Sequence, residues 1–166
     1  EATLISAIVS AQASILSNSN VTSLAATDLS TLGGKTAGTV TVTNAVAING
    51  DHDQLTAALV TESTKVEVNV ATVSVNDADG TAITAKELSA IGSTTTGTVT
   101  VTNAIDIKGS TSELIAALIT DSSKVIASTA NLAISDTPTS SQLTALDAVT
   151  TGNITYGGGE NAITGT

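Results

Sequence analysis

The sequence has 166 residues, which is enough for one ordinary domain or for a short stack of repeats. It contains no Cys, Met, Trp or Phe, and its formal net charge is −10. The absence of Cys excludes disulfide frameworks and thiol chemistry, and the acidic balance argues against nucleic-acid binding. The mean hydropathy of +0.33 is not that of a disordered chain. No apolar run approaches the ~20 residues of a spanning helix, so we expect no membrane insertion.

Short amphipathic helices are predicted at six places, where apolar residues recur three or four positions apart. In chain order these segments are residues 4–8, 29–32, 55–59, 88–91, 114–118 and 143–146. Most of them follow a Ser, Thr or Asp that we expect to cap the helix N-terminus. The expected caps are Thr27 or Asp28, Asp51, Thr84, Ser110 or Thr111, and Thr139 or Ser140.

Strands are predicted between these helices, because apolar and polar residues alternate there and many side chains are β-branched. Residues 39–43 and 98–102 alternate Thr with Val, and residues 45–48 and 104–107 follow them directly. Residues 65–75 alternate Val with other residues. The chain therefore consists of short units, each of about 28 residues, with the predicted order strand, bend, strand and short helix.

The sequence also repeats over a longer distance. The eight residues that begin at Gly38 recur without change from Gly97, and residues 55–61 return in similar form as 114–120. The distance from Gly38 to Gly97 defines a 59-residue repeat, which we call the long repeat.

We divide the chain into a partial first repeat (1–37), a second repeat (38–96), a third repeat (97–151) and a Gly-rich tail (152–166). The outer repeats are incomplete, so we expect a window of a longer array or a subunit that stacks end to end.

A short unit cannot bury its own apolar face, whereas stacked units share one thin core. Ala, Val, Ile and Leu make up almost all of the apolar residues, which suits such a narrow interior. We therefore predict an α/β fold, specifically a repeat solenoid of about six strand–strand–short helix units. The alternative is a single globular α/β domain formed by duplication.

No sequence pattern typical of an enzyme is present. There is no phosphate-binding loop, dinucleotide fingerprint or Gly-x-Ser-x-Gly motif. The single histidine, His52, is replaced by Thr111 in the next repeat, and we expect it to be an exposed residue at a helix start. We predict that the chain is not an enzyme and assign no catalytic residue.

Acidic turns near the predicted helices are candidate calcium sites, because Ca²⁺ prefers carboxylate and carbonyl oxygens. Asn76, Asp77 and Asp79 form a turn similar to half of an EF-hand loop, although its terminal Glu has no counterpart. Asp51 and Asp53 form a second candidate. An Asp before a helix is also a good N-cap. Capping and calcium binding both stay open, and calcium is the one cofactor that the sequence indicates.

The threonine strands raise a further possibility, since threonines aligned on one sheet face resemble the flat arrays of ice-binding solenoids. Residues 39–43 would have to align with residues 98–102. The Val-rich segment at 66–70 lies between them in the chain and would interrupt the array.

Residues 85–102 and 134–155 share the phrase Leu-x-Ala-Leu/Ile-x-x-x-Thr-Thr-Gly-x-Val/Ile-Thr. The phrase resembles the tandem repeats of very large secreted surface proteins of cyanobacteria and other marine bacteria. This resemblance implies an extracellular, often calcium-bearing structural role in adhesion, surface coats or cell–surface contact, without catalytic residues.

We therefore expect a structural repeat segment at the cell surface or outside the cell, acting as a stalk, spacer or filament building block. Its expected partners are neighbouring copies or repeats of the same protein, end to end. The alternatives are a calcium-dependent adhesion module and an ice-binding face.

Overall fold

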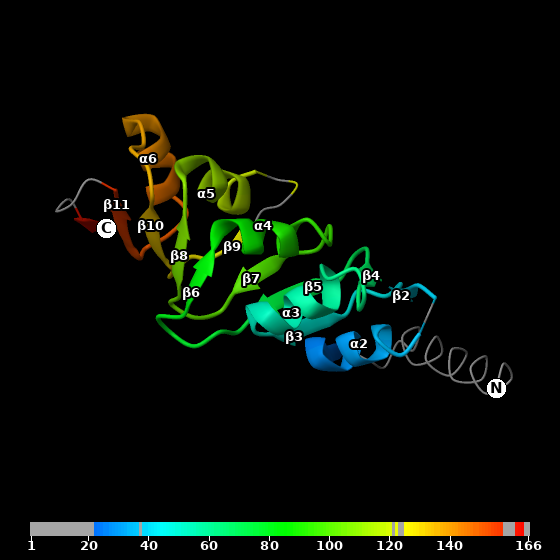
Figure 1. Cartoon of the computed structure of the whole chain (residues 1–166). Helices are drawn as coiled ribbons and strands as arrows, with labels where there is room; N and C mark the ends of the chain where they lie inside the picture. Colours follow the sequence, from blue (N-terminus) through cyan, green and yellow to red (C-terminus); the bar gives the residue numbers. More distant parts are fainter. Residues whose placement is uncertain (1–21, 37, 121, 123–124, 158–161, 165–166) are drawn as a thin grey trace, which may run out of the picture.

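The computed structural model describes residues 22–36, 38–120, 122, 125–157 and 162–164. It is an α/β structure in which short helices alternate with short strands (Figure 1), so the predicted class is confirmed. The elements in chain order are β1 (Ser23–Ala25), α2 (Ala26–Gly33), β2 (Val40–Val42), β3 (Ala47–Gly50), α3 (His52–Leu59), β4 (Val66–Val68), β5 (Thr72–Val75), β6 (Ala82–Thr84), α4 (Ala85–Gly92), β7 (Val99–Val101), β8 (Asp106–Gly109), α5 (Thr111–Leu118), β9 (Val125–Ile126), β10 (Asn131–Ile134), α6 (Ser140–Asp147), β11 (Asn153–Tyr156) and β12 (Ala162–Thr164). The helix predicted at residues 4–8 lies outside the described residues.

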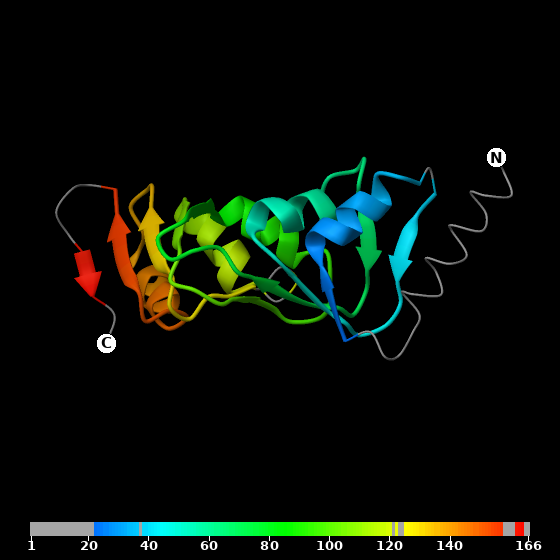
Figure 2. The same ribbon diagram turned by 90° about the horizontal axis from the view of Figure 1, so that it is seen from below.

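The elements follow one another along an elongated body. In Figure 2 the colours run from blue and cyan at one end, where β2 lies, to orange and red at the other, where β11 lies. Each described helix packs beside the next helix in the chain. The part of the predicted Gly-rich tail at Asn153–Tyr156 forms β11 rather than loop.

The described strands form two five-stranded sheets and one two-stranded sheet. The first sheet has the order β1-β3-β5-β7-β9 and is parallel throughout. The second has the order β12-β11-β10-β8-β6 and is parallel except for the pair β11 and β12. Strands β2 and β4 form the parallel two-stranded sheet. Parallel strands fit the short helical crossovers between them.

The second sheet reproduces the pairing of the first one at the spacing of the long repeat. The residues that face one another across the strands are Leu24, Ile48 and Val73 in the first sheet, and Ile83, Ile107 and Leu132 in the second. Strands β1, β3 and β5 therefore correspond to β6, β8 and β10. The sequence repeat is thus also a repeat of hydrogen-bonded register.

The two-stranded sheet corresponds to β7 and β9 by the same shift. Val40 faces Val66 in β2 and β4, and Val99 faces Val125 in β7 and β9. In the first sheet β7 and β9 continue from β5, so this sheet takes β1 from the first repeat, β3 and β5 from the second, and β7 and β9 from the third. By this correspondence, β2 and β4 are equivalent to the last two strands of such a sheet, β7 and β9.

The short units differ in length. Helix α3 begins at His52, α4 at Ala85 and α5 at Thr111, so the interval from α3 to α4 is longer than the interval from α4 to α5. The longer interval contains three strands, β4, β5 and β6, whereas the shorter one contains two, β7 and β8.

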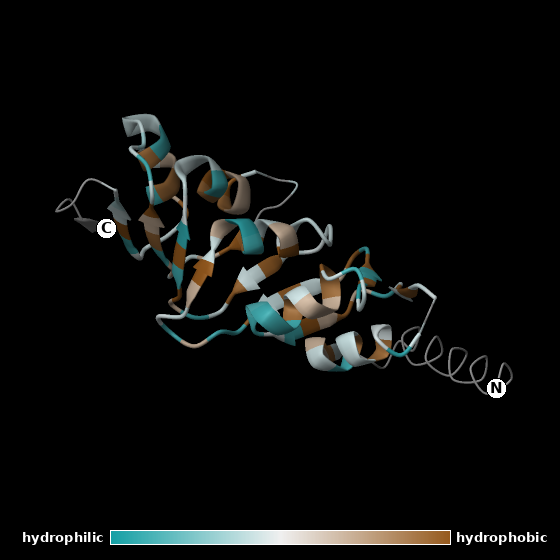
Figure 3. Cartoon of the chain, in the orientation of Figure 1, coloured by the Kyte–Doolittle hydropathy of each residue, from teal (hydrophilic) through white to brown (hydrophobic). Residues whose placement is uncertain are grey.

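The core is a continuous aliphatic layer along the whole body, and apolar residues recur from end to end in Figure 3. Its largest fully buried side chains are Leu29, Ile48, Leu55, Leu59, Ile83, Leu88, Ile91, Ile105, Ile107, Leu114, Leu118 and Leu132. Most of these form pairs related by the long repeat, such as Leu55 with Leu114. The repeat therefore places equivalent side chains at equivalent core positions.

Capping boxes begin four of the five described helices, which fixes where α3, α4, α5 and α6 start. Their N-caps Asp51, Thr84, Ser110 and Thr139 are among the predicted ones. The prediction for α2 is wrong, because its N-cap is Ala25 and residues 27 and 28 lie inside the helix. Ala25 corresponds to Thr84 in the long repeat but has no hydroxyl group to cap the helix.

Candidate functional site

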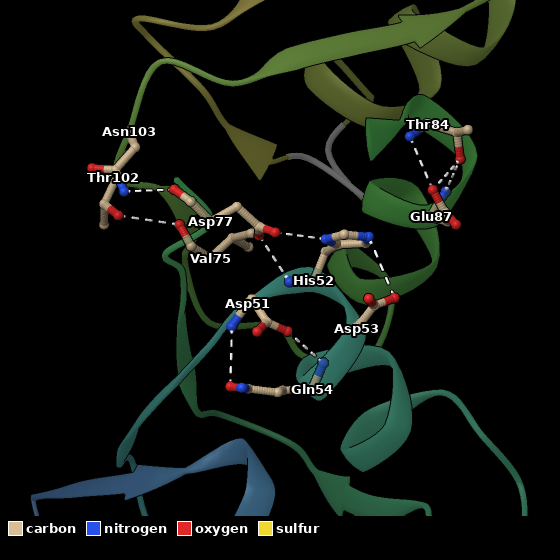
Figure 4. A network of polar contacts seen from close by, with 10 residues as sticks. All are labelled: Asp51, His52, Asp53, Gln54, Val75, Asp77, Thr84, Glu87, Thr102 and Asn103. Carbon is tan, nitrogen blue, oxygen red and sulfur yellow. Dashed lines mark hydrogen bonds and ion pairs between the residues drawn. The ribbon is translucent and has the colours of Figure 1, made fainter. Parts of the chain in front are cut away.

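The start of α3 is held by a carboxylate from the segment after β5. Asp77 Oδ2 accepts a hydrogen bond from the backbone N–H of His52 at 2.8 Å, and Asp77 Oδ1 lies 2.6 Å from His52 Nδ1 (Figure 4). Only 17% of the His52 side chain and 4% of the Asp77 side chain is exposed. His52 is at the helix start as expected, but it is part of a largely buried polar contact and not an exposed residue.

The same contact recurs in the next copy of the long repeat, with Thr in place of His. Asp136 Oδ1 accepts hydrogen bonds from the backbone N–H of Thr111 at 2.8 Å and from its hydroxyl at 2.6 Å. Both carboxylates lie at a helix N-terminus, where unpaired N–H groups and the helix dipole favour negative charge. We call these two contacts, His52 with Asp77 and Thr111 with Asp136, the latches.

The latches respond differently to pH. Burial lowers the pKa of His52, but its hydrogen bond to Asp77 and the nearby negative charges of Asp77 and Asp53 raise it, and the net pKa lies above its usual value. In the second latch, hydrogen bonds from the hydroxyl and backbone N–H of Thr111 lower the pKa of Asp136. The folded protein therefore favours protonated His52 and ionised Asp136.

The second predicted calcium candidate, Asp51 with Asp53, is divided between two roles. Asp51 is the N-cap of α3, and its Oδ1 accepts the N–H of Gln54 at 2.8 Å. Asp53 is exposed, with its Oδ1 3.4 Å from His52 Nε2. Within the described ranges, no three His, Cys, Asp or Glu side chains form a group that could hold a metal ion. The capping alternative accounts for Asp51, and the effect of calcium on stability distinguishes capping from calcium binding.

The first predicted calcium candidate, the turn after β5, is fastened to the chain between β7 and β8. Asp79 Oδ1 accepts the N–H of Ala104 at 2.8 Å, and Gly80 donates its N–H to the Ala104 carbonyl at 2.8 Å. Asn103 Nδ2 donates to the Asp77 carbonyl at 2.6 Å. Asn76 donates its backbone N–H to Gly50. These hydrogen bonds join the turn to β3 and to the chain between β7 and β8.

A second kind of contact joins the segment after α4 to the backbone before β5. The Thr95 hydroxyl donates to the Ala71 carbonyl at 2.7 Å and accepts the N–H of Gly97 at 3.0 Å. The Thr96 hydroxyl donates to the Asn69 carbonyl at 2.7 Å. A Cβ on Gly97 would lie 2.1 Å from the Ala71 oxygen, so this close approach requires glycine. We call this arrangement a clamp.

The second clamp follows α6 and repeats the first. The Thr150 hydroxyl donates to the Ala130 carbonyl at 2.5 Å, and the Thr151 hydroxyl donates to Ser128 at 2.9 Å. A Cβ on Gly152 would lie 2.1 Å from the Ala130 oxygen. These clamps are the Thr-Thr-Gly of the shared phrase. The phrase was recognised in the sequence but its role was not, although Thr hydroxyls commonly hydrogen-bond the backbone two residues on.

A third copy of the clamp is half formed. Thr36 Oγ1 accepts the N–H of Gly38 at 3.1 Å, as in the other two copies. A Cβ on Gly38 would meet no described atom closer than Thr36 Oγ1 at 3.7 Å. No described residue therefore occupies the position that Ala71 has in the first clamp. We call Thr36 and Gly38 the half-clamp.

The two Thr-Val strands lie in different sheets. Thr41 in β2 faces Glu67, whereas Thr100 in β7 faces Ser74 on one side and Ile126 on the other. The part of the chain that is described forms no continuous threonine array, so the arrangement adds no support for an ice-binding face.

Comparisons of the chain with protein-family models, curated proteins and solved structures found no match. None of the described helices has the length and apolar character needed to cross a membrane. The latches and clamps all join one segment of the chain to the next.

The first latch predicts a pH-dependent stability. Because the folded state raises the pKa of His52, the stabilising contribution is complete below the unfolded pKa of about 6.5 and is lost as pH rises through the folded pKa. His52→Thr, which copies Thr111, should lose this dependence. Urea unfolding of both proteins from pH 5 to 9 measures it, and a stability difference that stays constant across this range would contradict a charged latch.

The clamps predict different outcomes for two glycines in equivalent positions. Gly97→Ala should lower the free energy of unfolding by about 3 kcal/mol, because the new Cβ overlaps the Ala71 carbonyl. The matched variant Gly38→Ala should change it by less than about 0.5 kcal/mol, because the nearest described atom to its Cβ is Thr36 Oγ1 at 3.7 Å. Urea denaturation gives both values, and equal effects would show that the clamp contact is not required for stability.

The carboxylates of Asp77 and Asp79 already accept protein N–H groups, so we expect calcium to leave the stability of the chain unchanged. The measurement is the melting temperature in excess chelator and in millimolar calcium. A rise with calcium would reveal binding to the folded state, and Asp79→Asn should then abolish the rise.

Proposed function

We propose that this chain is a structural repeat segment, a spacer or stalk in a cell-surface or extracellular protein, built as an α/β repeat solenoid. The observation that supports this most is the recurrence of strand register, latches and clamps along the chain, with register and latches repeating at the spacing of the long repeat. In a solenoid each unit contacts only its neighbours, so length increases with the number of units while the cross-section stays constant.

The composition of the core supports a mechanical role. The described hydrophobic interior consists of Ala, Val, Ile and Leu, which fit a thin layer between strands and short helices. Dense packing of such side chains makes an interior of low compressibility. Successive units joined by continuous ladders would therefore hold two ends of a protein at a fixed separation.

The surface supports a location outside the cell. The chain has no Cys and a net charge of −10, and acidic proteins of this kind resist non-specific association. The resemblance of residues 85–102 and 134–155 to repeats of secreted bacterial surface proteins points the same way. The proposed partners are further units of the same repeat, end to end.

The proposal includes no catalysis. His52 is the one histidine of the chain, and its Nδ1 is engaged by Asp77 in a contact that joins α3 to the segment after β5. In the proposed structural role, this side chain holds the start of α3.

Small-angle scattering and negative-stain microscopy over a range of concentrations test the proposal. We expect thin rods, and a chain in which residues 38–96 are duplicated should give longer rods of the same cross-section. Compact particles, or an added repeat that thickens the particle instead of lengthening it, would contradict the solenoid. Antibody labelling of intact cells of the source organism tests the location, and a signal only after permeabilisation would contradict it.

A further inference from the structure

Among the described residues, β2 pairs with β4 on one side and no strand pairs with its other edge, which we call its outer edge. We propose that this edge, together with the half-clamp, is a docking site for one extended strand of the β5 type, supplied by another unit of the same repeat that lies ahead of β2. The inference rests on the proposed solenoid function and names the partner that this end of the chain binds.

The register of the docked strand follows from the repeat. In the first sheet β7 lies between β5 and β9, and Val73, Ser74 and Val75 face Val99, Thr100 and Val101. Strand β2 has the same sequence as β7 and pairs with β4 as β7 pairs with β9. No described strand of the β5 type pairs with β2.

The backbone groups that such a strand would bind are free of partners among the described residues. In the first sheet the Val73 N–H donates to the Thr98 carbonyl at 2.9 Å, and the Thr102 N–H donates to the Val75 carbonyl at 3.0 Å. The equivalents in the β2 segment are the Thr39 carbonyl and the Thr43 N–H. Both residues are exposed, and neither of these groups forms a hydrogen bond within the described part of the chain.

The half-clamp is an independent observation that points to the same partner. In both complete clamps, the glycine has no Cβ where a neighbouring alanine carbonyl lies 2.1 Å from the Cβ position. Gly38 keeps this glycine although no described atom needs the space. Thr36 Oγ1 already accepts the N–H of Gly38, which leaves its hydroxyl proton for an incoming carbonyl. Gly38 and the Thr36 hydroxyl could therefore accommodate a backbone carbonyl that no described residue provides.

The two ends of the body treat their sheet edges differently. At the far end, β11 corresponds to β7, and its outer edge is covered by β12 in antiparallel pairing. At the near end, β2 has the residues Val-Thr-Val, without the Lys or Pro that commonly blunts an exposed edge strand. An edge with no such protection is suited to accept a further strand.

The clamp also defines the sequence of the partner strand. Ala71 and Ala130, whose carbonyls are held in the complete clamps, are fully buried. In the first clamp, Ala71 is followed by alternating residues, of which Val73 and Val75 point into the core. The recognised pattern is therefore Ala, polar, apolar, small and apolar, and a large residue in place of Ala would not fit.

The test is a binding measurement with the full chain and a fluorescein-labelled, end-blocked peptide that has the sequence of residues 69–76. We expect saturable binding by fluorescence anisotropy, with protection of the Thr43 amide proton in NMR hydrogen exchange. Gly38→Val in the chain should weaken the affinity at least tenfold, since its side chain would occupy the carbonyl position. Thr137→Val, in an exposed turn remote from β2, is the matched control and should bind as the unmodified chain does.

Two peptide controls define specificity. A peptide with Ala71→Leu should bind at least tenfold more weakly, and a scrambled peptide should not bind. The docking site would be overturned if the peptide does not bind at millimolar concentration. It would also be overturned if the peptide binds the Gly38→Val chain as well as the unmodified chain, or if the scrambled peptide binds as well as the peptide itself. If scattering shows a rod but the peptide does not bind, the docking site is contradicted while the proposed spacer function is not.

Discussion

The arrangement depends on the register between neighbouring parallel strands, because a slip of one residue would turn every inward Val or Ile outward. A slip of two residues would keep the inward positions inward, and the ladders oppose it only weakly, since aliphatic side chains of similar size replace one another readily. Further specificity for the register comes from the buried polar residues among those described, which are Asp77, Thr95, Thr111 and Thr150. Each bonds to a segment distant in the sequence, and a slip would leave it unpaired at a cost of about 1–3 kcal/mol.

These polar contacts explain why the structural repeat contains two helices rather than one. The latches hold the starts of α3 and α5, whereas the clamps and the half-clamp follow the ends of α4, α6 and α2. Alternate helices are therefore fastened at opposite ends. The short unit captures the element order, but only the long repeat contains one latch and one clamp.

Local features of the sequence predicted the elements well because they depend on local physics. The Thr-Val alternation predicted β2 and β7, and the hydroxyl or carboxyl residues before the apolar runs predicted most capping boxes. Three features depend on distant partners and were missed: the change of sheet between β5 and β6, the burial of His52 against Asp77, and the close approach of Gly97 to Ala71. One clue was available for the last of these, because the Thr-Thr-Gly triplet occurs in both copies.

The latches also show which part of the contact the fold requires. The carboxylate is the same in both copies, and in both it accepts the first backbone N–H of a helix. The side chain that adds the second hydrogen bond differs, being an imidazole in His52 and a hydroxyl in Thr111. Because the backbone N–H fixes the position of the carboxylate, the side chain is free to change the electrostatic response without altering the path of the chain. A repeat protein with such contacts can vary its pH dependence from unit to unit while every unit keeps the same register.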